Sequence, residues 1–242
     1  MSLSGKRIVI VGGSSGIGYA VAEAALAAGA EVVVASSQRE RVEAAAARLG
    51  ERASGVTMDV RSEPDVAQAV EGIGALDHLV FTAGDWGAIR GAQALADLDI
   101  AAASAVFAVR FWGALTVVKH AHKLMPPEGS ITLTDGMVAH RPRRGGPLSS
   151  GMAGAVEHLA QGLAVDLAPI RVNAVCPGLV RTAIWDGVPE ERRAEQFKTM
   201  TGRQPLARPG EPAEVAEAYL YLMRGGYTTG QVLHVDGGMS IV

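Results

Sequence analysis

The chain has 242 residues, of which 48% are hydrophobic and 19% charged, with 30 glycines and 11 prolines. This balance excludes a disordered chain, a collagen-like repeat and a long coiled coil, and the length suits one large α/β domain or two small ones. A formal net charge of −3 argues against nucleic acid or an acidic membrane surface as an electrostatic partner. A charge or a glycine interrupts every apolar run before about 18 residues, so we expect no membrane span. The single cysteine, Cys176, cannot form an internal disulfide, and we expect a cytoplasmic protein.

Short β-branched runs alternate with segments of helical spacing along the chain. In the first half we expect strands at 7–11, 31–35, 54–58 and 78–81, and helices at 17–28, 39–49 and 65–71. In the second half we expect helices at 101–124, 151–167 and 215–223, and strands at 130–134, 171–175 and 231–235. This alternation predicts one α/β domain over residues 1–242, a doubly wound, seven-stranded parallel sheet of Rossmann type with helices on both faces. The stretch 181–209 breaks the rhythm, and it is either a mobile lid over a substrate site or a solvated insertion.

The first strand ends in a glycine-rich turn that opens directly into a helix. The turn is Gly12-Gly13-Ser14-Ser15-Gly16-Ile17-Gly18. Glycines let the backbone approach a pyrophosphate, and the helix N-terminus supplies N–H groups and the positive end of a dipole. A glycine-rich turn alone is a weak signal, but its place between the first strand and the first helix favours a dinucleotide site.

The residues after the second strand bear on the choice of cofactor. Dinucleotide folds often place an acid there to bind the ribose hydroxyls, whereas this chain has Ser36, Ser37 and Arg39. Hydroxyls and a guanidinium can bind a 2′-phosphate, so we expect NADP(H) rather than NAD(H). The alternative is that Arg39 and Arg41 are solvated residues on a helix face. Asp59 and Val60, after the third strand, lie where an adenine edge would bind.

With these motifs the sequence resembles the short-chain dehydrogenase/reductase family along its whole length. The matching residues are Gly12-x-x-x-Gly16-x-Gly18, Asp59-Val60, Asp77-x-Leu79-Val80, Ala83-Gly84, Arg171-Val-Asn-Ala-Val-x-Pro177-Gly178, Thr182, Gly210-Glu-Pro and Gly230-Gln-x-x-x-Val235-Asp-Gly-Gly. The resemblance implies a nicotinamide-dependent enzyme built from single-domain subunits that form dimers or tetramers. It also implies that cofactor contacts come from Thr82, Ala83, Gly84, Pro177, Gly178, Val180 and Thr182.

The family's chemistry rests on an Asn-Ser-Tyr-Lys tetrad, and this sequence departs from it at every position. Aligned without gaps, the tyrosine and lysine fall on Ser149 and Ala153, and the serine falls on Gly136. The asparagine of the long helix falls on Arg110. Loss of a positioned general acid costs a factor of about 10²–10⁴ in rate, so ordinary tetrad catalysis is excluded.

Four residues are candidates to carry a replacement chemistry. Arg110 can polarise a carbonyl, and a desolvated Asp135, which precedes the serine position, can deliver a proton. The alternative is a salt bridge between these two that fills the former site. Ser149 keeps a hydroxyl, but it is shorter in reach and a weaker acid than tyrosine. His140 is a surrogate acid whose loop, with Arg141, Arg143 and Arg144, either binds an anionic substrate or is a solvated segment.

These observations leave three functional hypotheses. The first is an oxidoreductase that uses NADP(H) on a carbonyl or alcohol with a non-standard proton donor. The second is a catalytically inactive nucleotide-binding homologue serving as a regulatory or assembly subunit, and the third is an isomerase or lyase without net redox change. No His or Cys has metal-ligand spacing, so we expect no metal site, and Cys176 is expected to be a small buried hydrophobe. The apolar faces of 101–124 and 151–167 predict a homo-dimer or homo-tetramer, and Trp86 and Trp185 are candidates to wall a pocket.

Overall fold

A sheet of seven parallel strands forms the centre of the computed structural model, which describes residues 2–84 and 95–242. The strands lie in the order β3-β2-β1-β4-β5-β6-β7. They are β1 (Arg7–Val11), β2 (Glu31–Ser36), β3 (Ala53–Thr57), β4 (His78–Phe81), β5 (Ser130–Thr134), β6 (Arg171–Pro177) and β7 (Val232–Val235). The order reverses between β1 and β4, so the sheet is doubly wound and the expected fold class is confirmed.

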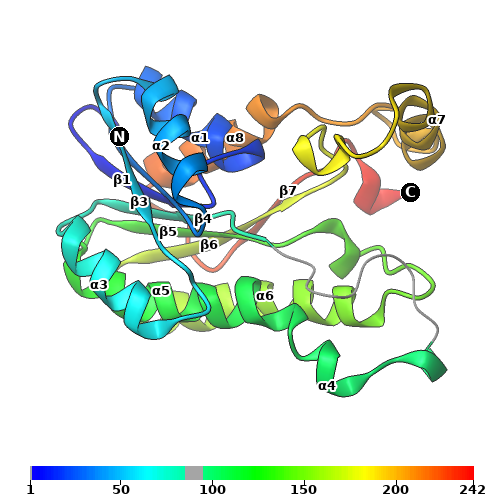
Figure 1. Cartoon of the computed structure of the whole chain (residues 1–242), viewed down its shortest axis with the longest axis horizontal. Coiled ribbons are helices and arrows are strands. Elements are labelled where there is room, and N and C mark those ends of the chain that lie inside the picture. The colour runs from blue at the N-terminus through cyan, green and yellow to red at the C-terminus, as the bar shows by residue number, and fades with distance from the viewer. Residues whose placement is uncertain (1, 85–94) are drawn as a thin grey trace.

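Helices cover both faces of the sheet (Figure 1). One layer holds α1 (Gly16–Ala27), α2 (Arg39–Leu49) and α8 (Pro212–Arg224), and the other holds α3 (Glu63–Ile73), α5 (Ala114–Ala121) and α6 (Pro147–Asp166). Two further helices lie outside these layers. They are the single-turn α4 (Ile100–Ala103) and the longer α7 (Glu190–Thr201). Single turns of 3-10 helix are η1 (Leu95–Asp97), η3 (His122–Leu124), η4 (Met137–Ala139), η5 (Ala183–Trp185) and η6 (Met239–Ile241).

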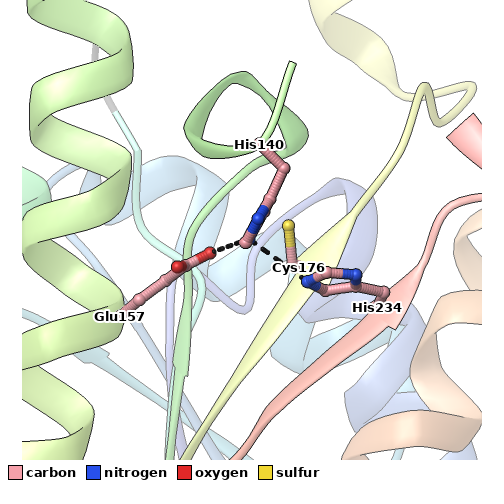
Figure 2. Close-up of side chains that lie close together, drawn as sticks. All are labelled: His140, Glu157, Cys176 and His234. Atoms are coloured by element: carbon pink, nitrogen blue, oxygen red, sulfur yellow. Dashed lines mark hydrogen bonds and ion pairs between the residues drawn. The ribbon is translucent and has the colours of Figure 1, made fainter. Parts of the chain in front are cut away.

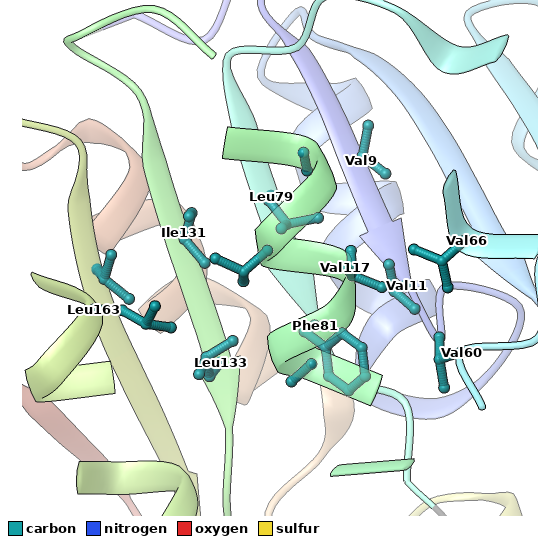
Figure 3. Close-up of a cluster of buried hydrophobic side chains, with 14 of the residues drawn as sticks. Val9, Val11, Val60, Val66, Leu79, Phe81, Val117, Ile131, Leu133 and Leu163 are labelled. Carbon is teal, nitrogen blue, oxygen red and sulfur yellow. The ribbon is translucent and has the colours of Figure 1, made fainter. Parts of the chain in front are cut away.

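Two apolar cores fill the space between the sheet and its helix layers, because strand side chains alternate between the two faces. On the side of α3, α5 and α6, Val9, Leu79 and Ile131 from three adjacent strands pack against Val117 and Leu163 (Figure 3). On the other side a second core joins the alternate strand residues to α1 and α8. Packing on both faces therefore fixes the positions of the strands, including their carboxyl ends.

The helix expected over 101–124 is interrupted. After α4 the chain forms a π-helical segment, η2 (Ala108–Gly113), before it continues as α5. By length and composition the whole helical stretch Ile100–Leu124 meets the criteria for a membrane span, with a mean hydropathy of 1.7 in its most apolar window. Only 28% of that window is buried, so most of its apolar surface faces outward. An outward apolar surface is also what the expected pairing between subunits requires.

The stretch 181–209 folds into η5 and α7 at the end of the molecule where β5 leads into α6 (Figure 1). The Trp185 ring packs edge-on against Phe197 of α7, with centroids 5.1 Å apart. Its indole nitrogen donates a hydrogen bond to the carbonyl of Val180, 3.2 Å away. These contacts anchor the insertion next to the turn that follows β6.

Candidate cofactor and substrate site

The glycine-rich turn lies against the end of β4, at the point where the strand order reverses. Gly12 and Gly16 have φ of +86° and +55°, a region that favours glycine. A Cβ on Gly12 would lie 2.5 Å from the backbone nitrogen of Ala83, so only glycine fits this approach. Helix α1 begins after Ser15 with no capping side chain and no acidic residue in its first turn. Its N–H groups and dipole therefore fit a pyrophosphate.

The turn after β6 approaches the same helix end. A Cβ on Gly16 would lie 3.5 Å from the Cβ and Cγ2 of Thr182. Gly178 packs against the backbone of Asp236, where a Cβ would lie 2.7 Å from the Asp236 Cα. Val180 is buried and forms a bridge to Gly210. The structure thus brings the two segments proposed for the pyrophosphate and the nicotinamide next to each other.

The residues proposed for the adenosine half follow β2 and β3. Ser36 is half-buried at the end of β2, and Ser37 and Arg39 are exposed. The Nε of Arg39 donates to the Glu43 carboxylate one helical turn later, at 2.7 Å. This pair raises the pKa of Arg39 and places a carboxylate in competition with a 2′-phosphate.

Asp59 and Val60 occupy the loop between β3 and α3. The Asp59 carboxylate accepts two hydrogen bonds from the Arg61 guanidinium, each 2.9 Å long, and one from the Arg61 backbone N–H at 3.0 Å, and this hydrogen bonding lowers its pKa. Val60 is buried and packs against Gly113. A Cβ on Gly113 would lie 2.7 Å from the Cγ2 of Val60. The loop proposed for the adenine edge therefore packs against the π-helical segment.

That segment places the Arg110 side chain at the end of β4. A Cβ on Gly84 would lie 2.5 Å from the Arg110 Nη2, so this glycine leaves the space that the guanidinium occupies. Arg110 Nη1 donates to the main-chain oxygen of Asp135 at 3.2 Å. Burial lowers the pKa of Arg110, and the negative charge of Asp135 opposes that shift. Local π-helix frequently occurs at functional sites, and its position was not predicted from helical periodicity.

Asp135 directly follows β5 and is 2% exposed. Neither carboxyl oxygen reaches a hydrogen-bond partner at standard geometry among the described residues, although Glu157 and the Cys176 thiol lie beside it. Burial and the neighbouring Glu157 raise the pKa of Asp135 to about 8. Arg110 meets Asp135 through its main-chain oxygen, and within residues 2–84 and 95–242 no ion pair joins the two side chains. The expected alternative of a salt bridge filling the site is therefore wrong for this structure.

His140 follows η4 and contacts two residues that the sequence did not single out. Its Nε2 lies 2.6 Å from Glu157 Oε1 and 3.2 Å from His234 Nε2 (Figure 2). Cys176, buried as expected, is the fourth member of this group. The four come from separate elements, so no local spacing could reveal them. The structure therefore brings together a group of residues that could hold a metal ion, which local spacing could not indicate.

The remaining loop residues are distributed differently from the expected anion site. The Arg141 guanidinium donates to the main-chain oxygens of Met239 and Ser240, at 3.1 and 2.9 Å, which ties it to the C-terminal segment. Arg143 and Arg144 are exposed. The proposal that these three arginines form one anion-binding cluster is therefore not supported for Arg141.

The proposed replacement for the tetrad tyrosine lies on α6. Ser149 is in its first turn and partly exposed, and Ala153 is buried one turn later. Helix α6 contains no tyrosine and no lysine. Tyr219 of α8 is fully buried, and its hydroxyl lies 2.7 Å from Thr134 Oγ1 while burial raises its pKa. It packs in the core on the opposite face of the sheet from α6. Trp86 lies outside the described residues.

Comparisons with known proteins agree with this architecture. A family model described as enoyl-(acyl carrier protein) reductase matches residues 11–240. Short-chain dehydrogenase/reductase ATR9 of Stachybotrys chlorohalonatus is 36% identical over 253 residues, covering 98% of each chain. The solved MalC Reductase/Diels-Alderase from Malbranchea aurantiaca is 33% identical with a TM-score of 0.90, covering 98% of this chain and 97% of its own. A small-chain dehydrogenase solved in complex with NADPH is 30% identical with a TM-score of 0.80, covering 99% and 100%.

A family match over nearly the whole chain, together with the parallel sheet and its glycine turn, decides the relationship. The chain belongs to the short-chain dehydrogenase/reductase family.

Proposed function

We propose that this chain is an NADP(H)-dependent oxidoreductase that acts on a carbonyl or alcohol with a proton donor other than the family's tyrosine. The observation that carries the proposal is the meeting of two turns at one helix end. The glycine-rich turn and Thr182 lie together at the N-terminus of α1, which has no capping side chain and no acid in its first turn. A chain that binds no dinucleotide would not need both the glycine-rich turn and the turn after β6 at this helix end. The NADPH complex of one relative supports the nicotinamide cofactor.

The cofactor, when bound, supplies or accepts the hydride at the carbon of the reacting carbonyl or alcohol. The chain's own residues bind and orient the reactants. The N-terminus of α1 holds the pyrophosphate, and the segment Pro177–Thr182 orients the nicotinamide. Arg110, fixed between Gly84 and the main chain of Asp135, polarises the carbonyl oxygen and stabilises the charge that develops there.

The proton comes from a group other than tyrosine. The candidates are Asp135, His140 and Ser149, which lie at the end of β5, after η4 and in the first turn of α6. Variants that remove each group in turn, Asp135→Asn, His140→Gln and Ser149→Ala, identify the donor by a loss of kcat with an unchanged affinity for NADPH. A donor within this set predicts that one variant falls by a factor of about 10²–10⁴.

The preference for NADP(H) rests on Ser36, Ser37 and Arg39. No carboxylate at the end of β2 repels a 2′-phosphate, although Glu43 engages Arg39 from the following turn. The hydroxyls and the guanidinium supply the charge-assisted hydrogen bonds that a 2′-phosphate needs.

A second candidate is an isomerisation, lyase or ring-forming reaction without net hydride transfer. A solved relative with the same fold favours it, because that protein is described both as a reductase and as a Diels–Alderase. Incubation with NADPH and a panel of carbonyl compounds, followed by product analysis, separates the candidates. Oxidation of NADPH in step with product supports the oxidoreductase. Conversion with NADPH unoxidised contradicts it and supports the second candidate, and binding without conversion of any compound supports a regulatory or assembly subunit.

A further inference from the structure

Four potential metal ligands meet between α6 and the last two strands of the sheet (Figure 2). Glu157 comes from α6, Cys176 from β6 and His234 from β7, and His140 follows η4. Cys176 and His234 are directly paired in the register of β6 and β7, so their side chains share one face of the sheet. One ligand atom from each of the four lies within 4.8 Å of the others.

The spacing of these atoms is close to that of a tetrahedral site. Zinc bonds of about 2.0–2.3 Å place the ligand atoms roughly 3.3–3.8 Å apart. The two histidine Nε2 atoms are 3.2 Å apart, and the His140 Nε2 lies 2.6 Å from the Glu157 carboxylate. Side-chain shifts of about 1 Å would therefore bring the four ligand atoms to tetrahedral spacing around an ion.

The polar groups of the cluster are not satisfied by one another. His140 Nε2 faces both His234 Nε2 and the Glu157 carboxylate, but a ring nitrogen carries either one proton or one lone pair. It cannot make two full hydrogen bonds with these partners. A cation held by the lone pairs of both rings removes this conflict.

The second observation is Asp135, whose carboxyl oxygens reach no hydrogen-bond partner at standard geometry among the described residues, although Glu157 and the Cys176 thiol lie beside them. It is 2% exposed. Buried unsatisfied carboxyl oxygens are rare and call for a partner. Beside a metal site, Asp135 would act as an outer carboxyl that hydrogen-bonds a ligand, as such groups commonly do.

The donor set selects the ion. Two imidazoles, a thiolate and a carboxylate suit zinc, since magnesium and calcium prefer oxygen ligands alone. A thiolate and a carboxylate also balance the two positive charges of the ion. Glu157 and Cys176 are buried, whereas His140 and His234 are open to solvent, which leaves an entry path.

We propose that His140, Glu157, Cys176 and His234 bind one Zn²⁺ ion in a closed tetrahedral site. Because all four positions are protein ligands, the site is structural rather than a place for a reacting water. It fastens the loop after β5 and α6 to β6 and β7. Because His140 binds the ion through Nε2, this proposal leaves Asp135 and Ser149 as the candidate proton donors. Cys176 immediately precedes the Pro177-Gly178 turn, so the ion holds in place the segment assigned to the nicotinamide.

The test measures zinc binding by the full-length chain with any polyhistidine tag removed. Metal-free protein, prepared with a chelator, is titrated with Zn²⁺ alone, and with Co²⁺ as a spectroscopic probe. We expect one equivalent per chain, the charge-transfer band of a Co²⁺–thiolate bond and the d–d bands of tetrahedral cobalt. Zinc should also raise the Tm of the metal-free protein, because it binds the folded state.

Two ligand variants and one matched control decide the assignment. Cys176→Ser should abolish the thiolate band, and His234→Gln, at an exposed position that is safe for folding, should weaken binding by more than about 100-fold, beyond the loss typical of an outer partner. Asp135→Asn should weaken it by about tenfold. His158→Gln, an exposed histidine of α6 outside the cluster, should bind as the unmodified chain does. Binding that is absent in the unmodified chain, or that survives equally in His234→Gln, overturns the proposal.

Discussion

The guanidinium of Arg110 lies at the end of β4, in space that Gly84 leaves open. It donates a hydrogen bond to the main-chain oxygen of Asp135. A cation fixed in this way is positioned to stabilise negative charge without reorganising during the reaction. Arg110→Ala should lower kcat by a factor of about 10²–10³, the loss typical of a missing oxyanion donor, with little change in the Kd for NADPH.

The matched control for this prediction is Arg41→Ala, because Arg41 is an exposed residue of α2. Its kcat should equal that of the unmodified protein. Circular dichroism should show that Arg110→Ala remains folded. Unchanged turnover in both Arg110→Ala and Asp135→Ala would remove the pair from the mechanism.

His78 predicts a stability that depends on pH. It is 5% exposed in β4, and its Nδ1 lies 2.8 Å from Ser130 Oγ of β5. Burial lowers its pKa to about 4, with Arg171 and Lys6 acting in the same direction and Asp77 opposing them. The unfolded chain takes up this proton near pH 6.5, and the folded chain does so only near pH 4. Stability is therefore full above pH 6.5 and falls as the pH drops through this window.

The loss assigned to His78 between these two pH values is about 3 kcal/mol at most. Urea unfolding at a series of pH values measures it. His78→Asn should flatten the slope of unfolding free energy against pH in this window, whereas the exposed His158→Gln should leave it unchanged. An equally steep slope in His78→Asn would contradict the assignment.

At the scale of elements, the proposed preference for NADP(H) over NAD(H) depends on the first turn of α2. Arg39→Ala removes the guanidinium proposed for the 2′-phosphate, and it should weaken NADPH binding by about 10–100-fold, the worth of a hydrogen bond to a charged group. NADH binding should not change. Glu43→Gln should strengthen NADPH binding by up to about twofold, because it frees Arg39 from an i,i+4 ion pair.

Arg41→Ala is the matched control, since Arg41 is an exposed residue of the same helix. Its NADPH affinity should stay within the error of the titration. Equal losses in Arg39→Ala and Arg41→Ala would show a general electrostatic effect of α2 instead of a phosphate contact.

How far sequence predicts structure differs between elements of this chain. The bounds of α2, β4 and β5 coincide with the expected ranges, since β-branched runs and glycine or proline breaks mark them. The π-helical segment that carries Arg110 was missed, because an added residue in a helical turn leaves the surrounding apolar pattern nearly unchanged.

The candidate site divides in the same way. The glycine turn could be predicted because its function is local in sequence. The meeting of His140, Glu157, Cys176 and His234 could not, because it depends on a loop, a helix and two strands packing together. Sequence spacing detects ligand pairs on one element, and here each element supplies a single ligand.

For the whole molecule, the outward surface of Ile100–Leu124 and α6 predicts a homo-dimer or homo-tetramer. Val165 of α6 and Trp112 are 82% and 58% exposed in the single chain. Large exposed apolar patches commonly mark interfaces. Val165→Asp should shift the mass measured by light scattering toward the monomer, because it places a charge in the contact.

Ile184→Asp is the control for this prediction, since Ile184 is 65% exposed on η5, whose Trp185 packs against Phe197 of α7. It should leave the mass unchanged. A monomeric unmodified protein at micromolar concentration would contradict the prediction.

The central claim is that the two turns at the N-terminus of α1 bind a phosphorylated nicotinamide dinucleotide. A fluorescence titration of the purified protein with NADPH and, separately, with NADH tests it most directly. We predict saturable binding of NADPH at one site per chain and markedly weaker binding of NADH. Binding of neither dinucleotide would contradict this claim. The glycine-rich turn and the turn after β6 would then serve only to pack the fold.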